Sequence, residues 1–124
     1  MVERDDGAAF GRSRLQLSVR HVDPDHTIIV LAGRFDAVEA MEVRERMTRA
    51  DIATAKHLVF DLTDVTFLDS AGLAVLVRAR QDRLRTGSSV SLIRPASDDA
   101  MRVLRLTQFD QIFTILDDQA RETT

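Results

Sequence analysis

The chain has 124 residues, of which 44% are hydrophobic and 30% are charged, and its net charge is -3 at pH 7. This length and composition predict one globular domain with a single core. The acidic balance argues against a nucleic-acid-binding protein, which needs a basic face, and the lack of cysteine excludes disulfides and Cys-based zinc sites.

The two ends of the chain are polar. The first residues, MVERDDGAAFGRSR, carry acids where a signal peptide has an apolar stretch, and no apolar run in the chain is long enough to span a membrane. We therefore expect a cytoplasmic protein that contacts neither nucleic acid nor membrane directly. The polar ends predict a flexible extension over residues 1–13 and a flexible tail over 118–124, around one domain at 14–117.

The first third of the domain predicts a hairpin followed by a helix. Apolar residues alternate in LQLSVRHV (15–22), and HTIIVLAG (26–33) follows a DPD turn, which indicates two antiparallel strands. The segment AVEAMEVRERMTRA (37–50) has helical spacing, with Asp36 at the N-cap position. We expect five residues of this helix on or beside its buried side: Ala37, Val38, Ala40, Met41 and Met47.

The next segments predict the centre of the fold. HLVFDL (57–62) is short and nearly all apolar, which is typical of a strand covered on both faces. After a loop at TDVTF (63–67), a helix is expected from Ser70 to about Arg85, with Gly87 at its end. Its inward residues are expected to be Leu73, Leu76, Val77 and Leu84.

The last third predicts a strand, a helix and another strand. Pro95 ends the strand SSVSLI, and Ser97 can cap a third helix whose Met101, Val103 and Leu104 face inward. The last strand is expected at QIFTIL (111–116). Because strands and helices alternate after the hairpin, we expect an α/β fold, with a mixed sheet of four to five strands and helices attached by crossovers.

The segment FLDSAGL (67–73) places Ser70 where a buried strand leads into a helix. Its hydroxyl has three possible roles: a helix N-cap, a catalytic nucleophile, or an acceptor that another enzyme modifies. Gly72 follows in the first helical turn, where alanine would be the better helix former. Either this glycine packs tightly against a neighbouring element or it allows the backbone of another molecule to approach.

A catalytic role for Ser70 has little support in the sequence. A nucleophile elbow reads G-x-S-x-G, but Leu68 stands two positions before the serine. The hydrolase order also needs a later histidine, whereas His21, His26 and His57 all precede Ser70. These histidines lack the spacing of a helical metal site, and RTGSSVS is not a P-loop. We expect no enzymatic activity, no metal and no cofactor.

Three segments carry a resemblance to a known family. VFDLTDVTFLDSAGLAVLVRA (59–79) resembles the signature segment of the STAS domain, specifically that of bacterial anti-sigma factor antagonists. LAGRFD (31–36) is similar to the family's Gly-x-x-Asp motif before its first helix, and residues 91–115 are similar to its last strand, helix and strand. The family often has a glycine after that helix, where this chain has Thr107-Gln108-Phe109, so we expect a differently shaped or mildly strained helix end.

The resemblance implies a STAS-like fold and a partner switch that acts on transcription, as in stress responses. The unphosphorylated antagonist binds an anti-sigma factor that is also a serine kinase, and so releases a sigma factor. Phosphorylation of the serine weakens the complex, and a serine phosphatase resets it. The alternative is a non-enzymatic STAS scaffold in a signalling or transport complex, without a phospho-switch.

Carried over to this chain, the resemblance makes Ser70 the phosphoacceptor and Asp69 its acidic neighbour. It also implies that Gly72 is a site of close approach, that Asp36 lies near the same surface, and that Ala71 replaces a second hydroxyl. The partner-binding residues are then Asp36, Asp69, Ala71 and Gly72. We expect helix N–H groups to accommodate a phosphate on Ser70.

Overall fold

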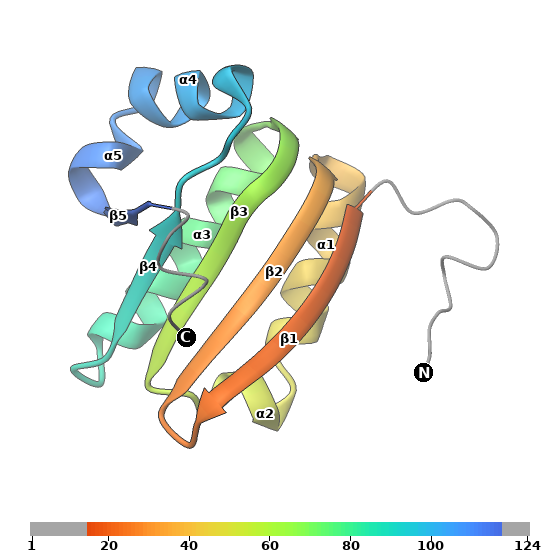
Figure 1. Ribbon diagram of the computed structural model, residues 1–124. Coiled ribbons are helices and arrows are strands. Elements are labelled where there is room, and N and C mark those ends of the chain that lie inside the picture. Colours follow the sequence, from red (N-terminus) through yellow and green to blue (C-terminus); the bar gives the residue numbers. More distant parts are fainter. Residues whose placement is uncertain (1–14, 118–124) are drawn as a thin grey trace, which may run out of the picture.

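Ten helices and strands form in residues 15–117, the part of the chain that the computed structural model describes (Figure 1). The extension and tail expected at 1–13 and 118–124 lie outside this part. In chain order the elements are β1 (Leu15–Asp23), β2 (His26–Phe35), α1 (Ala37–Met47), α2 (Ala50–Ala53), β3 (His57–Leu68), α3 (Ser70–Leu84), β4 (Ser89–Ile93), α4 (Asp98–Leu106), α5 (Phe109–Ile112) and β5 (Thr114–Leu116).

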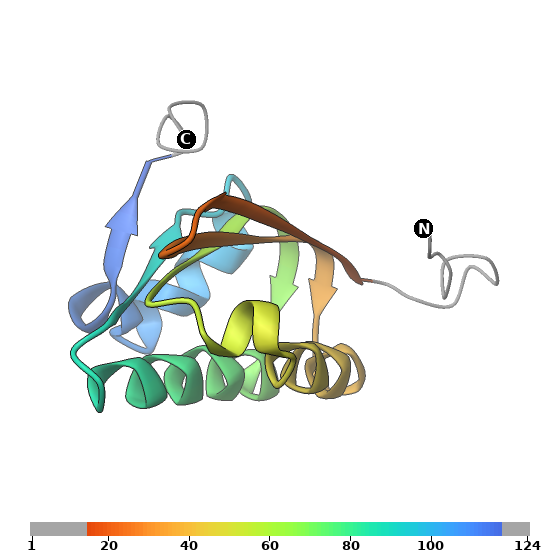
Figure 2. The same ribbon diagram turned by 90° about the horizontal axis from the view of Figure 1, so that it is seen from below.

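The strands form one mixed sheet in the order β1-β2-β3-β4-β5. The β1–β2 hairpin is antiparallel and the other three pairs are parallel, which confirms the predicted fold class and the central place of β3. Each crossover connection leads from one parallel strand to the next one in the sheet, always in the same direction across it. Because such crossovers are right-handed, their helices lie on the same face of the sheet. Figure 2 shows α1 and α3 side by side along one face of the sheet. No helix within residues 15–117 is long and apolar enough to cross a membrane.

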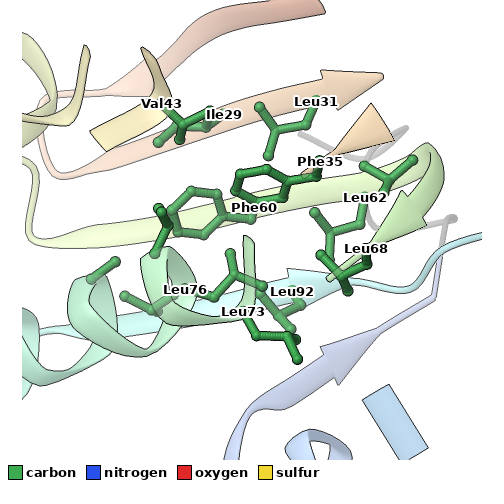
Figure 3. Packing of buried hydrophobic residues seen from close by; sticks show 14 of the residues in the cluster. Ile29, Leu31, Phe35, Val43, Phe60, Leu62, Leu68, Leu73, Leu76 and Leu92 are labelled. Atoms are coloured by element: carbon green, nitrogen blue, oxygen red, sulfur yellow. The ribbon is translucent and has the colours of Figure 1, made fainter. Parts of the chain in front are cut away.

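The core lies between the sheet and these helices. Phe35 from β2 and Phe60 from β3 are fully buried at its centre, and Leu76 of α3 packs with them (Figure 3). The strands contribute alternate residues because successive side chains of a strand point to opposite faces. Further buried members of the cluster are Ile29, Leu31, Val43, Leu62, Leu68, Leu73 and Leu92.

The prediction of a loop at TDVTF (63–67) was wrong. β3 continues through this segment to Leu68, and its partner β2 is long enough to pair with it as far as Phe35. Val, Thr and Phe are residues that favour strands, and Val65 is buried in the core. The strand therefore leads directly into α3.

The predicted buried side of α1 was wrong in part. Val38 and Met41 are 62% and 71% exposed and Ala37 is exposed too, whereas Ala40 and Val43 are buried. Residues two apart on a helix lie about 200° apart around its axis, so Val38 and Ala40 cannot both face the core, nor can Met41 and Val43. The small side chain of Ala40 and the branched one of Val43 pack inward, and the two larger apolar residues point to solvent.

Two further expectations, for Leu84 and for the last strand, were wrong in part, whereas the expected cap of the third helix was confirmed. Leu84 at the end of α3 is 53% exposed, whereas its neighbour Arg83 is buried, so the last turn packs with the Arg83 side inward and Leu84 faces solvent. QIFTIL forms the end of α5 and then β5, which has only three residues. Ser97 caps α4 by accepting a hydrogen bond from the Ala100 N–H at 3.2 Å, as predicted.

The helix end after α4 shows the strain expected from its sequence. Gln108 has a φ of 63° and a ψ of 22°, in the left-handed region that favours glycine.

Gln108→Gly is therefore expected to raise the free energy of unfolding by about 0.5–1 kcal/mol, after allowing for the added freedom of the unfolded chain. Urea denaturation measures this change. The control is Gln111→Gly in α5, an ordinary helical position where glycine is expected to destabilise; an equal effect at both positions would contradict the argument.

Candidate functional site

The carboxyl ends of β2 and β3 carry the same local structure. Phe35 and Leu68 are paired in the parallel register, and an aspartate follows each of them. Asp36 caps α1 and Asp69 caps α3, both in extended backbone with ψ of -173°. Because neighbouring strands lie about 4.8 Å apart, the two caps are neighbours at one edge of the sheet. The structure therefore brings Asp36 to the same edge of the sheet as Ser70, at the carboxyl ends of β2 and β3, as the resemblance implied.

Asp69, and not Ser70, is the N-cap of α3. Its Oδ1 accepts hydrogen bonds from the N–H groups of Ala71 at 3.0 Å and Gly72 at 3.2 Å. Ser70 is the first residue of the helix and is exposed, and within residues 15–117 its hydroxyl forms no hydrogen bond. The cap role considered for Ser70 was wrong. β3 stays in register with β2 up to Leu68, the Asp69 N–H still donates to the Phe35 carbonyl oxygen at 3.4 Å, and the Asp69 side chain then caps the helix.

This cap also changes what a phosphate on Ser70 can contact. The N–H groups of Ala71 and Gly72 already donate to Asp69, and the Leu73 N–H donates to the Asp69 carbonyl at 3.0 Å. The expected accommodation by helix N–H groups is therefore largely blocked. A carboxylate stands beside the serine instead.

Gly72 is buried and has a structural reason to lack a side chain. A Cβ at this position would lie 2.7 Å from the carbonyl oxygen of Phe35 and 3.0 Å from Cδ1 of Leu68. The first is a backbone atom at the end of β2, which cannot move without disturbing the strand pair. Tight packing within the fold therefore accounts for this glycine, and it was one of the two explanations considered from the sequence. The backbone that approaches Gly72 closely belongs to β2 of the same chain. Ala71 beside it is half-buried against the core.

Exposed apolar side chains surround this edge. Phe67, at the end of β3, is 36% exposed, and the guanidinium of Arg34 lies 4.0 Å from its ring centre. Arg34 Nε is 3.6 Å from Asp36 Oδ2, so the cation links the aromatic ring to the cap of α1. Val38 and Met41 add exposed apolar area on α1. Apolar residues beside charged ones are typical of a surface that binds another protein.

An open groove with a volume of about 770 Å³ runs along α3 from Ser70. Arg44 of α1 and Phe109, the first residue of α5, also line this groove. Because these residues are far apart in the chain and come together only in the fold, sequence reasoning could not find the groove. Its apolar lining consists of Leu73, Ala74, Val77 and Phe109, and its cationic residues are Arg44 and Arg78.

All three histidines lie at the opposite end of the sheet. His26 pairs with His57 where β2 and β3 begin, their rings are stacked with centroids 4.9 Å apart, and His21 faces Thr27 on the neighbouring strand. The twelve residues of β3 place this end roughly 35 Å from Ser70. A Ser-His catalytic pair is therefore not formed.

The carboxylates with a clearly lowered pKa belong to this far end too. A hydrogen bond from His26 lowers the pKa of Asp23, and hydrogen bonds from Arg46 lower the pKa of Asp51 to about 2. His21 Nε2 lies 3.4 Å from Asp51, which joins these groups to the same end of the sheet. Ion pairs and hydrogen bonds on the surface explain both shifts, so they do not indicate a reactive centre.

The comparisons with known proteins agree with the resemblance seen in the sequence. The family model described as the STAS domain matches residues 18–121. An anti-sigma-B factor antagonist of Listeria monocytogenes is 32% identical over 82% of this chain and 88% of its own length.

Two solved structures share the fold. The anti-sigma factor antagonist SpoIIAA in its unphosphorylated form superposes with a TM-score of 0.72 at 14% identity, covering 86% of this chain and 92% of that one. The Bacillus cell fate determinant SpoIIAA in its phosphorylated form gives 0.67 at 14% identity, covering 87% and 97%. At such identity the likeness shows the fold alone.

Proposed function

Because this chain belongs to the STAS domain family, we propose that it is an anti-sigma factor antagonist that is switched by phosphorylation of Ser70. The unphosphorylated protein binds an anti-sigma factor that is also a serine kinase, and a sigma factor is released. The kinase transfers the γ-phosphoryl group of a nucleoside triphosphate to Ser70 Oγ, which loses its proton, and a serine phosphatase hydrolyses the ester. The protein acts in the cytoplasm and has no catalytic role itself.

The observation that carries this proposal is that the fold does not use the Ser70 hydroxyl. Asp69 caps α3, so Ser70 is exposed at the start of the helix with its oxygen open to another molecule. Of the expected partner contacts, Asp69 and Ala71 are half-buried and can touch a partner directly. Asp36 and Gly72 are buried, so their contribution is to shape the edge that the partner meets.

The switch follows from charge. Phosphorylation adds about 1.5 to 2 negative charges at neutral pH, beside the Asp69 carboxylate and near the Asp36 cap. In the free protein, water solvates this charge. A partner docked on the edge excludes that water, so the phosphate is both repelled by the carboxylates and desolvated. The names of the relatives, one of them an anti-sigma-B factor antagonist, support the same role.

The proposal is tested by phosphate transfer from a candidate anti-sigma kinase. With the kinase and ATP, mass spectrometry of peptides is expected to find one phosphate, on Ser70, and none in the Ser70→Ala variant. Ser97 is an internal control, because it also stands at a helix start but its oxygen accepts a hydrogen bond from the Ala100 N–H. A kinase that binds the protein tightly yet transfers no phosphate to Ser70 would support the scaffold alternative instead.

A further inference from the structure

A phosphate on Ser70 finds few free donors at the helix start, so a nearby cation would stabilise it beyond what water does. The N–H groups of Ala71 and Gly72 donate to Asp69, whose carboxylate adds negative charge next to the serine. Phosphate oxygens form their strongest hydrogen bonds with arginine, which presents several N–H donors in one plane. The arginines around Ser70 are therefore the groups to compare.

One arginine contacts Asp36 and Phe67 at this edge, two line the groove that begins at Ser70, and two of these three are engaged. Arg34 pairs with Asp36 at 3.6 Å and lies over the Phe67 ring. Arg78 lines the same groove as Ser70, but its Nε is 3.4 Å from Asp82 Oδ1. Arg44 of α1 also lines that groove and is exposed, and within residues 15–117 it forms no ion pair.

The arrangement of the two helices places Arg44 further along the groove than Ser70, and its side chain tilts back toward the serine. α1 and α3 start at the same edge, because the residues before their caps are paired in register. Arg44 lies seven residues after the first residue of α1, or about 10 Å along its axis. Helical side chains tilt toward the N-terminus, and the long arginine side chain shortens this offset toward the level of Ser70.

We infer that Arg44 is the cation that pairs with the phosphate of phosphorylated Ser70 within the same molecule. The inference rests on the proposed modification of Ser70 and adds a residue from a different element to it. The pair spans the groove between α1 and α3 at the Ser70 end. Phosphorylation then covers the apolar lining of the groove at this end in addition to changing the charge of the edge.

The test measures the pKa of the phosphate itself. Phosphoserine is incorporated at position 70 during synthesis, and ³¹P NMR follows its titration around the second pKa, near 6. An arginine pair stabilises the dianion, so Arg44→Gln is expected to raise this pKa by roughly 0.3–0.7 unit. Arg44→Lys is expected to restore part of the difference, and 1 M NaCl is expected to reduce it.

Arg78→Gln is the matched control, with the same change of charge in the same groove. It is expected to shift the phosphate pKa by less than a third of the Arg44→Gln shift. An unchanged pKa in Arg44→Gln, or an equal shift in Arg78→Gln, would overturn the inference. No kinase takes part, so a negative result here is separate from a failure of phosphate transfer to Ser70. Circular dichroism of each unphosphorylated variant checks the fold, and Arg44→Lys keeps the test valid if glutamine disturbs α1.

Discussion

Phosphorylated protein is expected to bind the anti-sigma kinase about 100-fold more weakly than the unmodified protein, and Ser70→Asp about 10- to 100-fold more weakly. A penalty of a few kcal/mol for a repelled and desolvated charge corresponds to these factors. The aspartate has the smaller effect because it carries one charge and a shorter side chain. Ser70→Ala keeps the edge neutral at this position and is expected to bind as the wild type does.

The fold is expected to tolerate all of these changes. Ser70 is exposed and does not cap α3, so Ser70→Ala is expected to change the free energy of unfolding by less than about 0.5 kcal/mol. A negative charge in the first turn of a helix is compatible with its dipole. Loss of binding without loss of stability is therefore the signature of the switch.

Titration calorimetry of the four forms against the kinase measures the affinities, and urea denaturation measures their stability. Ser97→Asp is the matched control, since it adds the same charge at another helix start while aspartate remains a good cap. This variant is expected to bind normally. Equal affinities for the phosphorylated and unmodified proteins would exclude the proposed switch.

Local patterns in the sequence predicted most of the fold. The hairpin followed from alternation around a turn, and β3 from a short run of apolar and branched residues. The start of α3 at Ser70 was predicted correctly. Its cap was not, because Asp69 and Ser70 are adjacent and both types favour that position. What decides between them is where β3 leaves its partner strand, and that depends on the length of β2.

The surface around Ser70 was the least predictable part. The orientation of α1 depends on Ala40 and Val43 packing inward, and this turns Val38 and Met41 outward against their hydrophobicity. The groove joins Arg44 to Phe109, residues far apart in the chain. Periodicity describes one element at a time, so neither feature could be read from it.

Gly72→Ala is expected to lower the free energy of unfolding by about 1–3 kcal/mol. The added Cβ would stand 2.7 Å from the Phe35 carbonyl oxygen, and overpacking of this kind typically costs that much. Helix propensity acts in the opposite direction, since alanine is favoured over glycine by up to about 1 kcal/mol in a helix interior. The clash is expected to dominate because the obstacle is backbone at the end of β2 and not a flexible side chain.

Ala74→Gly, at an exposed site on the same helix, is the control that measures propensity alone. If propensity governed position 72, Gly72→Ala would stabilise the protein by about the amount that Ala74→Gly costs. Urea denaturation of both variants is expected to show two losses of stability instead of a loss and a gain. A gain in Gly72→Ala would mean that β2 and α3 can separate at little cost. Packing against β2 would then not explain the glycine, and the close approach of a partner would be its reason.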